Sequence, residues 1–326
     1  MIIANKSVSR GSKEVVKANV ARLTSGNDLK IIAHVIAGSN DGKTLGLIGG
    51  IHGDETHCFE FFNKLIQNIN PKDLNGNLII IPVANPLAFE NLSRNTPTDN
   101  LDLNRNFPGN KDGWLTEKIA YVISEEFVKK MDYLIDFHTS PPFLVVEYTI
   151  ISKNSKNKEE FINIAKSFGF KFIYNTYGYK GALTTFATEI GITSIATESG
   201  PINEDNEAYS NTMIKKIKNV LALLNLINSK PNIEGDFLIF EENAYGNMRA
   251  PAGGIFIPGD PEIYIGKEKD ENLILFKIYD PYTFDLIKEV KPIFKRSAVF
   301  LYRKRSVVKP GDYCYMICDL NKSNKV

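Results

Sequence analysis

The segment Gly49-Gly50-Ile51-His52-Gly53-Asp54-Glu55 places a histidine and a glutamate three residues apart in a glycine-rich turn. It directly follows an apolar run, residues 44–48, and is therefore expected where a buried strand ends. Imidazole nitrogen and carboxylate oxygen are both good zinc ligands, and glycine lets the backbone turn sharply. His52 and Glu55 could converge on one metal ion, although this spacing also suits a helix-start acid beside a hydrogen-bonded histidine.

Other chemically capable side chains also follow apolar runs. His138 does so in DFHTS, Glu198 does so in ATESG, and Asn85 follows a third run. In open α/β sheets ligands bind beyond the carboxyl ends of the strands, so we expect these side chains to share one edge with His52 and Glu55. Two histidines and one glutamate complete a three-ligand catalytic zinc site with a position left for water. Glu198 then remains as a carboxylate that can act as a base.

A polar segment rich in asparagine, proline and glycine supplies candidate cations. Arg94 lies in Asn91-Leu92-Ser93-Arg94, and Asn104 and Arg105 lie in LDLNRNFPG. Arginine in a loop is usually a solvated surface residue. Beside a zinc cleft, however, its planar fork can bind a carboxylate through two hydrogen bonds.

Apolar runs that alternate with helical stripes indicate the elements that position these residues. The runs that resemble buried strands are residues 29–35, 44–48, 78–83, 133–137 and 192–197, and the helical stripes are residues 59–66, 119–128, 161–168 and 213–227. Continuous apolar strands alternating with amphipathic helices predict an α/β fold, with a mixed, largely parallel sheet flanked by helices on both faces.

The pattern changes after residue 229, where SKPNIEGD is typical of a linker. Short β-type runs follow at residues 254–257, 273–278, 297–302 and 313–317, with turns expected at residues 246, 252–254, 259–261, 280–281 and 309–311. Short strands separated by regular turns predict a small all-β sandwich or barrel. We therefore expect a catalytic α/β domain over residues 1–230 and a β-rich C-terminal domain over residues 231–326.

Composition narrows the class of protein. The chain has 326 residues and a formal net charge of +1, which disfavours nucleic-acid or membrane-surface binding through bulk charge. It has three cysteines, too few for a disulfide framework, and no apolar run typical of a signal peptide or a transmembrane helix. These features predict a cytoplasmic protein whose partners include neither nucleic acid nor a membrane, and they are compatible with a homo-oligomer.

Four motifs in order, GGIHGDE, LDLNRNFPG, DFHTS and ATESG, resemble those of the succinylglutamate desuccinylase/aspartoacylase family. That family is the deacylase branch of the zinc carboxypeptidase superfamily. The C-terminal segments RAPAGGIFIP and VVKPGD resemble the β-domain found in many of its predicted deacylases, so the resemblance covers nearly the whole chain.

The resemblance implies a role for each matching residue. His52, Glu55 and His138 become ligands of one zinc ion per chain, and Glu198 becomes the general base and acid. Asn104 and Arg105 become the binders of a free substrate carboxylate. Two further residues depart from the family pattern. Arg94 becomes the oxyanion stabiliser, at a spacing that varies among relatives, and Lys180 becomes a substrate-binding residue where relatives often carry arginine.

The implied activity is hydrolysis of an amide between an acyl group and an amino acid or related small amine, by a water that zinc activates and Glu198 deprotonates. One alternative is a cytoplasmic metallocarboxypeptidase acting on short peptides or cell-wall fragments. Another is a binding protein on a decayed hydrolase scaffold, which should have lost a ligand or the base. His34 and His57 are expected to be structural, and Tyr245 or Tyr282 of the C-terminal domain could reach the site.

Overall fold

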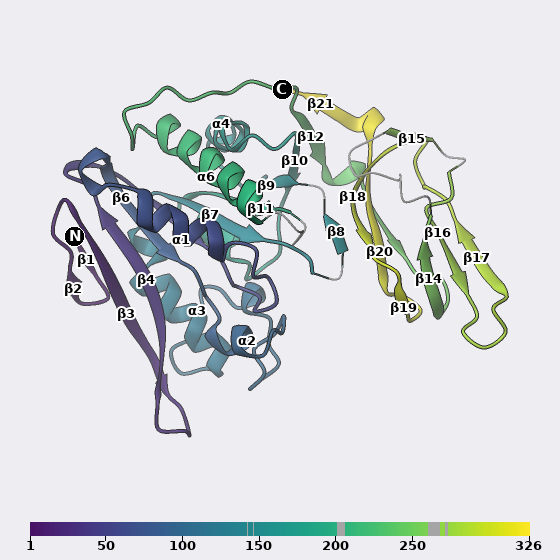
Figure 1. The fold of residues 1–326 in the computed structure, drawn as a ribbon, viewed down its shortest axis with the longest axis horizontal. Coiled ribbons are helices and arrows are strands. Elements are labelled where there is room, and N and C mark those ends of the chain that lie inside the picture. The colour runs from purple at the N-terminus through teal and green to yellow at the C-terminus, as the bar shows by residue number, and fades with distance from the viewer. Residues whose placement is uncertain (142, 146, 201–205, 260–267, 271–272) are drawn as a thin grey trace.

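The computed structural model describes residues 1–141, 143–145, 147–200, 206–259, 268–270 and 273–326. Its centre is a ten-stranded sheet (Figure 1). From edge to edge the strands are β21 (Ser323–Lys325), β12 (Leu238–Glu241), β10 (Phe172–Thr176), β9 (Tyr148–Ser152), β11 (Thr193–Glu198), β7 (Tyr133–His138), β5 (Asn40–Ile48), β6 (Asn75–Ile81), β4 (Asp28–Ala37) and β3 (Ser12–Arg22). The consecutive strands β11, β7, β5 and β6 are parallel, so the predicted mixed, largely parallel sheet is confirmed.

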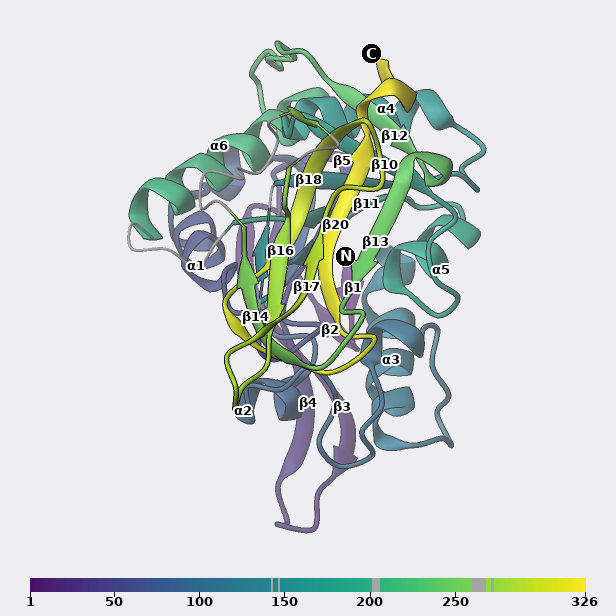
Figure 2. The ribbon, with the colours of Figure 1, turned by 90° about the vertical axis from the view of Figure 1, so that its right-hand side faces the viewer.

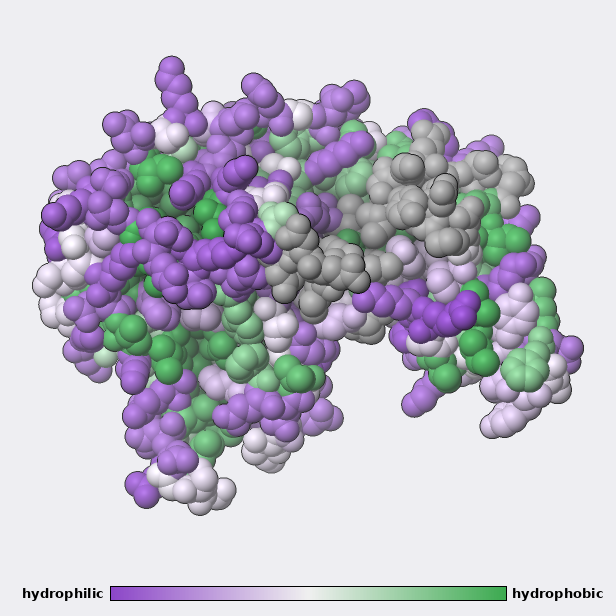
Figure 3. All heavy atoms as spheres, viewed as in Figure 1, coloured by the Kyte–Doolittle hydropathy of each residue, from purple (hydrophilic) through white to green (hydrophobic). Residues whose placement is uncertain are grey.

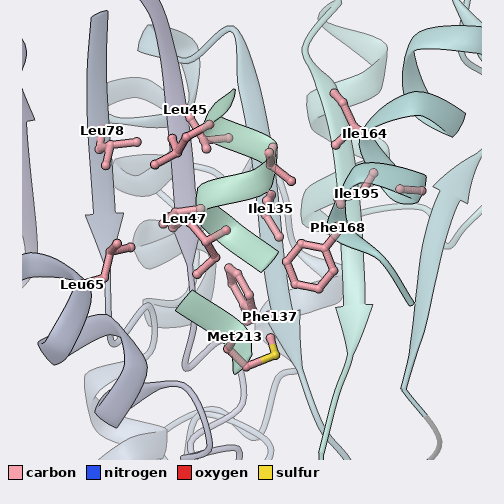
Figure 4. Close-up of a cluster of buried hydrophobic side chains, with 14 of the residues drawn as sticks. Leu45, Leu47, Leu65, Leu78, Ile135, Phe137, Ile164, Phe168, Ile195 and Met213 are labelled. Atoms are coloured by element: carbon pink, nitrogen blue, oxygen red, sulfur yellow. The ribbon is translucent and has the colours of Figure 1, made fainter. Parts of the chain in front are cut away.

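Helices cover both faces of this sheet (Figure 2). They are α1 (Phe59–Asn68), α2 (Pro86–Glu90), α3 (Leu115–Glu126), α4 (Lys158–Phe168), α5 (Leu183–Glu189) and α6 (Asn206–Leu223). Helices α1, α4 and α6 pack on one face, where Leu65, Phe168 and Met213 meet side chains of the central strands (Figure 4). Helices α3 and α5 pack on the other face. Burial on both faces explains why the central strands are continuous apolar runs.

The C-terminal part forms antiparallel sheets beside the α/β part, as predicted (Figure 1). One sheet contains β13 (Tyr245–Arg249), β20 (Tyr313–Asp319), β18 (Arg296–Arg303) and β15 (Glu268–Asp270), with β8 (Phe143–Val145) paired to β18. The other contains β17 (Leu286–Val290), β16 (Phe276–Tyr279), β14 (Gly254–Pro258) and β19 (Ser306–Val308), and a small N-terminal ribbon contains β1 (Ile2–Ile3) and β2 (Lys6–Ser7). Strands β12 and β21 join the large sheet, and the division at residue 230 stays a prediction.

The element boundaries differ from the sequence pattern in places. The apolar stripe runs to residue 227, but α6 ends at Leu223, because Asn225 adopts a left-handed conformation with φ of 57° and Ile227 pairs with Leu74. The turn expected at residues 259–261 falls partly outside the described residues. Within the described chain, none of the helices combines the length and hydrophobicity needed to cross a lipid bilayer.

Candidate metal centre

The turn after β5 requires glycine at two positions. Gly50 has a φ of 62°, in the left-handed region that side chains disfavour, and a Cβ on Gly53 would lie 2.0 Å from the backbone of Ala88. This tight turn carries His52 and Glu55 into the interior, where both are 3% exposed. The backbone N–H of Glu55 donates to the carbonyl of His52 across 3.2 Å and fixes the turn.

His52, Glu55 and His138 converge from two strand ends. His52 Nδ1 lies 2.7 Å from Glu55 Oε1, and His138 Nδ1 lies 2.8 Å from Glu55 Oε2. One candidate ligand atom from each residue lies within 4.8 Å of the others, and all three residues are buried. Two imidazole nitrogens and a carboxylate are a donor set that suits zinc. These three residues could therefore hold a metal ion.

Carboxylates also contact the far nitrogens of both histidines. Asp102 Oδ1 lies 3.2 Å from His52 Nε2, and Asp136 Oδ2 lies 2.9 Å from His138 Nε2. Burial alone would lower the pKa of His138, but Asp136 and Glu55 raise it well above its ordinary value. Carboxylates in this position orient metal-binding imidazoles and make them more basic. Sequence reasoning missed both, although Asp136 and His138 are two apart on one strand and so share a face.

We expect Asp136→Asn to weaken metal binding about 10- to 100-fold, because the amide keeps the hydrogen-bond acceptor but removes the charge behind His138. Competition with a metal-binding dye measures the dissociation constant. Asp112→Asn, which alters an exposed loop carboxylate, serves as the control and should bind metal as the unchanged protein does. An unaltered dissociation constant in a folded Asp136→Asn protein would contradict this role.

Glu198 lies beside the candidate ligands. It is the last residue of β11, in register with His138 on the parallel strand β7 and with Tyr148 on the antiparallel strand β9. Its Oε2 is enclosed and has no hydrogen-bond partner among the described residues. Burial, and then the negative charge of Glu55, raise the pKa of Glu198 to about 7. A carboxylate with such a pKa can both take and return a proton near neutral pH.

The predicted polar residues of the 94–106 segment also reach this region. Arg94 Nη2 donates to Asp102 Oδ2 across 2.9 Å, and Arg94 Nη1 lies 3.9 Å from Glu55 Oε1. Asn104 Nδ2 lies 3.3 Å from His138 Nε2, and its Oδ1 accepts a hydrogen bond from the backbone of Leu183. The guanidinium of Arg105 lies 4.2 Å from the centre of the Tyr179 ring. Both arginines remain partly exposed and can reach a bound molecule.

Other sequence candidates lie away from the ligands. Lys180 is exposed and does not line the cavity described below, so its contact with substrate stays a prediction. Asn85 is fully buried, where its side chain caps α2 and donates to Thr96. His57 is buried, and burial lowers its pKa to about 4; among the described residues neither ring nitrogen has a hydrogen-bond partner, so the structural role expected of it stays a prediction.

The candidate ligands line a cavity of about 660 Å³, which both parts of the chain enclose. The α/β part contributes the three candidate ligands and, in addition, Glu198, Arg94 and Arg105. The C-terminal part contributes Glu242, Tyr245, Leu301, Tyr313 and Met316. Figure 3 shows an open notch between the two parts on the face in view. Of the two tyrosines considered from sequence, Tyr245 lines the cavity and Tyr282 is 89% exposed.

A second cavity, of about 480 Å³, lies where β7 and β11 begin. Its polar groups satisfy one another, because Tyr133 and Thr193 both donate to Glu160, across 2.9 and 2.8 Å. Lys43 pairs with Asp132 in the same cavity. It lies at the opposite ends of the strands from His138 and Glu198, so the reactive groups belong to the larger cavity.

Known proteins resemble the part of the chain that contains the candidate ligands. The family model for the succinylglutamate desuccinylase/aspartoacylase catalytic domain matches residues 41–227. A curated relative, N-alpha-acetyl-L-2,4-diaminobutyric acid deacetylase from Halomonas elongata, is 33% identical over 132 residues. That match covers 40% of this chain and 39% of the relative, so the aligned part spans well under half of the relative's length.

Solved structures resemble the whole chain in fold. The product-bound ectoine utilization protein EutE (DoeB) from Ruegeria pomeroyi superposes with a TM-score of 0.85 at 21% identity, covering 96% of this chain and 97% of that one. A succinylglutamate desuccinylase/aspartoacylase from Rhodobacter sphaeroides gives a TM-score of 0.82 at 20% identity, covering 98% of this chain and 99% of that one. The C-terminal sheets are therefore part of the shared architecture.

Proposed function

This chain belongs to the succinylglutamate desuccinylase/aspartoacylase family, and from this we propose that it is a zinc-dependent deacylase. Its substrate would be an N-acylated amino acid or a related small amide with a free carboxylate. The relative from Halomonas elongata is by name a deacetylase of such a compound. The observation that carries the proposal is the convergence of His52, Glu55 and His138 beside Glu198 in one cavity.

In the proposed mechanism His52, Glu55 and His138 would hold one zinc ion, which would supply Lewis acidity to a water and to the amide carbonyl. Glu198 accepts a proton from the attacking water and returns it to the leaving nitrogen. Arg94 donates hydrogen bonds to the oxygen that becomes negatively charged. Its distance of 3.9 Å from Glu55 supports this role, because the guanidinium already lies beside a candidate ligand.

Arg105 and Asn104 would hold the substrate's carboxylate. Stacking on Tyr179 restricts the guanidinium of Arg105, and the backbone of Leu183 fixes the amide of Asn104. Both residues line the cavity, so a carboxylate bound there would place the neighbouring amide near Glu198. The buried free thiols of Cys58, Cys314 and Cys318 are compatible with the proposed cytoplasmic location.

Substrate pairs that differ only at the carboxylate test this proposal. We expect the protein to hydrolyse N-acetyl amino acids and to lose about tenfold or more in kcat/KM on their primary amides, since a charge-assisted hydrogen bond is removed. In Arg105→Ala that preference should disappear, whereas Lys111→Ala, which alters an exposed side chain, should keep it. A chromatographic assay of the released amine gives the rates.

Assays with peptides can contradict the proposed deacylase function. If peptides longer than two residues are cleaved faster than N-acyl amino acids, the protein is a metallocarboxypeptidase, which would use the same ligands and Arg105. If neither class is hydrolysed by zinc-loaded protein, the proposed function is wrong.

A further inference from the structure

We propose that Glu242 determines substrate specificity by binding a cationic group, so that the substrate carries a protonated amine as well as its carboxylate. This inference rests on the proposed deacylase function. Glu242 belongs to the C-terminal part of the chain, outside residues 41–227 that match the family model, and it lines the same cavity as Arg105 and the candidate ligands.

The carboxylate of Glu242 is held in one orientation. Its Oε1 accepts hydrogen bonds from Thr176 Oγ1 across 2.7 Å and from the backbone N–H of Tyr177 across 2.9 Å. The hydrogen bond from Thr176, followed by that from Tyr177, lowers the pKa of Glu242, so the group is ionised at neutral pH. Both bonds use Oε1, which leaves Oε2 available to a bound molecule.

The neighbouring cations pair with Glu241 instead. Lys153 Nζ lies 2.8 Å from Glu241 Oε2, and Lys158 Nζ lies 3.9 Å from Glu241 Oε1. Among the described residues, no lysine or arginine forms an ion pair with Glu242. The adjacent glutamates thus differ: Glu241 pairs directly with two lysines, whereas the charge of Lys153 acts on Glu242 from beyond ion-pair distance. Within the described residues the Glu242 carboxylate therefore has no directly paired cation.

Aromatic rings complete a site suited to an ammonium group. Tyr174 and Tyr245 stack with ring centres 5.3 Å apart, and both line the cavity. Thr176, which donates to Glu242, lies two residues after Tyr174 on β10, so these two side chains share a face of the sheet and bring the carboxylate to the side of the Tyr174 ring. A cation is attracted to ring faces as well as to a carboxylate.

The described cavity lining has two cationic side chains, Arg94 and Arg105. Arg94 pairs with Asp102, and Arg105 stacks on Tyr179, whereas Lys180 is exposed and outside the lining. The cavity therefore offers arginines that can bind a carboxylate and, at Glu242, a carboxylate that can bind a cation. This charge pattern fits the N-acyl derivative of a diamino acid better than that of an acidic amino acid.

Isosteric substrates test the inference. Nα-acetylornithine ends in an ammonium group, and N-acetylnorleucine has a methyl group in its place. We expect the unchanged protein to favour Nα-acetylornithine about tenfold in kcat/KM. The preference is limited to this size because the site is partly open to solvent, which weakens an ion pair. It should appear mainly in KM, because Glu242 binds a part of the substrate that does not react. Shorter and longer homologues of Nα-acetylornithine would show which distance between the amide and the ammonium group the site accepts. Higher ionic strength should reduce the preference, because salt screens the charge of Glu242.

Glu242→Gln and Glu241→Gln form a matched pair of variants. Glutamine at 242 keeps an oxygen acceptor for Thr176 and Tyr177 and removes only the charge, so the preference should vanish while turnover of N-acetylnorleucine stays within about twofold. Glu241→Gln should keep the preference. Equal rates on the two substrates in the unchanged protein, or an undiminished preference in Glu242→Gln, would overturn the inference.

Binding measurements separate this inference from the proposed function. Isothermal titration calorimetry of the zinc-loaded Glu198→Gln protein gives the affinities for the two compounds without turnover. A tighter complex with Nα-acetylornithine that depends on Glu242 supports the inference even if no hydrolysis occurs, which would overturn only the proposed function. Equal affinities overturn the inference even if both compounds are hydrolysed.

Discussion

Glu198→Gln lowers turnover by about 10³-fold or more and leaves zinc affinity unchanged, because general acid–base catalysis contributes about 10²- to 10⁴-fold and the amide can neither take nor return a proton. Glutamine has nearly the size of glutamate, so β11 and its register with β7 should persist. Steady-state kinetics and metal analysis of the same preparation measure both quantities.

Glu160→Gln is the control for this change. Glu160 is bonded to Tyr133 and Thr193 at the opposite strand ends, so its variant should keep full activity. Activity of Glu198→Gln within about tenfold of the unchanged enzyme would exclude Glu198 as the proton carrier, given the size expected for such a group.

The pH dependence offers an independent observation on the same residue. Burial and the charge of Glu55 raise the pKa of Glu198 to about 7 in the absence of metal. A bound cation favours the ionised carboxylate and acts in the opposite direction. Since the base must be unprotonated, kcat/KM should fall with decreasing pH at or below pH 7. The residual activity of Glu198→Gln should not show this decrease of kcat/KM at low pH.

Removal of the metal should stop the reaction, because the proposed mechanism depends on a water activated by zinc. We expect chelation to abolish hydrolysis and added zinc to restore it, whereas His138→Ala should be inactive with or without zinc. Binding should also stabilise the fold, by about 4 kcal/mol when free zinc is a thousandfold above its dissociation constant. Thermal unfolding with and without zinc measures this second effect.

His34 provides the histidine control. It lies on β4, outside the residues that line the cavity, so His34→Ala should bind zinc and keep its thermal response to it. Full activity in protein shown to be free of metal would refute a metal-dependent mechanism. A normal thermal response in His138→Ala would refute the assignment of that ligand.

The convergence of the candidate ligands was predictable because His138 follows an apolar run directly, and His52 and Glu55 lie in the turn after another one. Strands buried on both faces of a parallel sheet consist of nearly uninterrupted apolar residues, so the ends of β5, β7 and β11 can be located from the sequence. The side chains that follow them, His52, His138 and Glu198, then meet by topology alone. Strand β3, by contrast, is an edge strand whose sequence SKEVVKANVAR is mostly polar, and its pattern does not distinguish it from a loop.

The remaining parts of the site depend on contacts between distant segments. Glu242 and Tyr245 reach the cavity only because β12 pairs with β10, which no local pattern predicts. Asp102 supports His52 across 50 residues of sequence. Asn85 ends a run as the ligands do, yet it caps a helix, because a side-chain amide can satisfy a helix terminus as readily as it can face a ligand.

The short strand β8 has a consequence for cooperativity. It follows His138 closely along the chain, and it pairs with β18 of the C-terminal sheet, joining Val145 to Leu301. The strand that follows a candidate ligand is therefore at the edge of a sheet in the other part of the molecule. Local opening of that sheet would release this segment, so the two parts should behave there as one folding unit, with ligand geometry protected by the stability of the sheet.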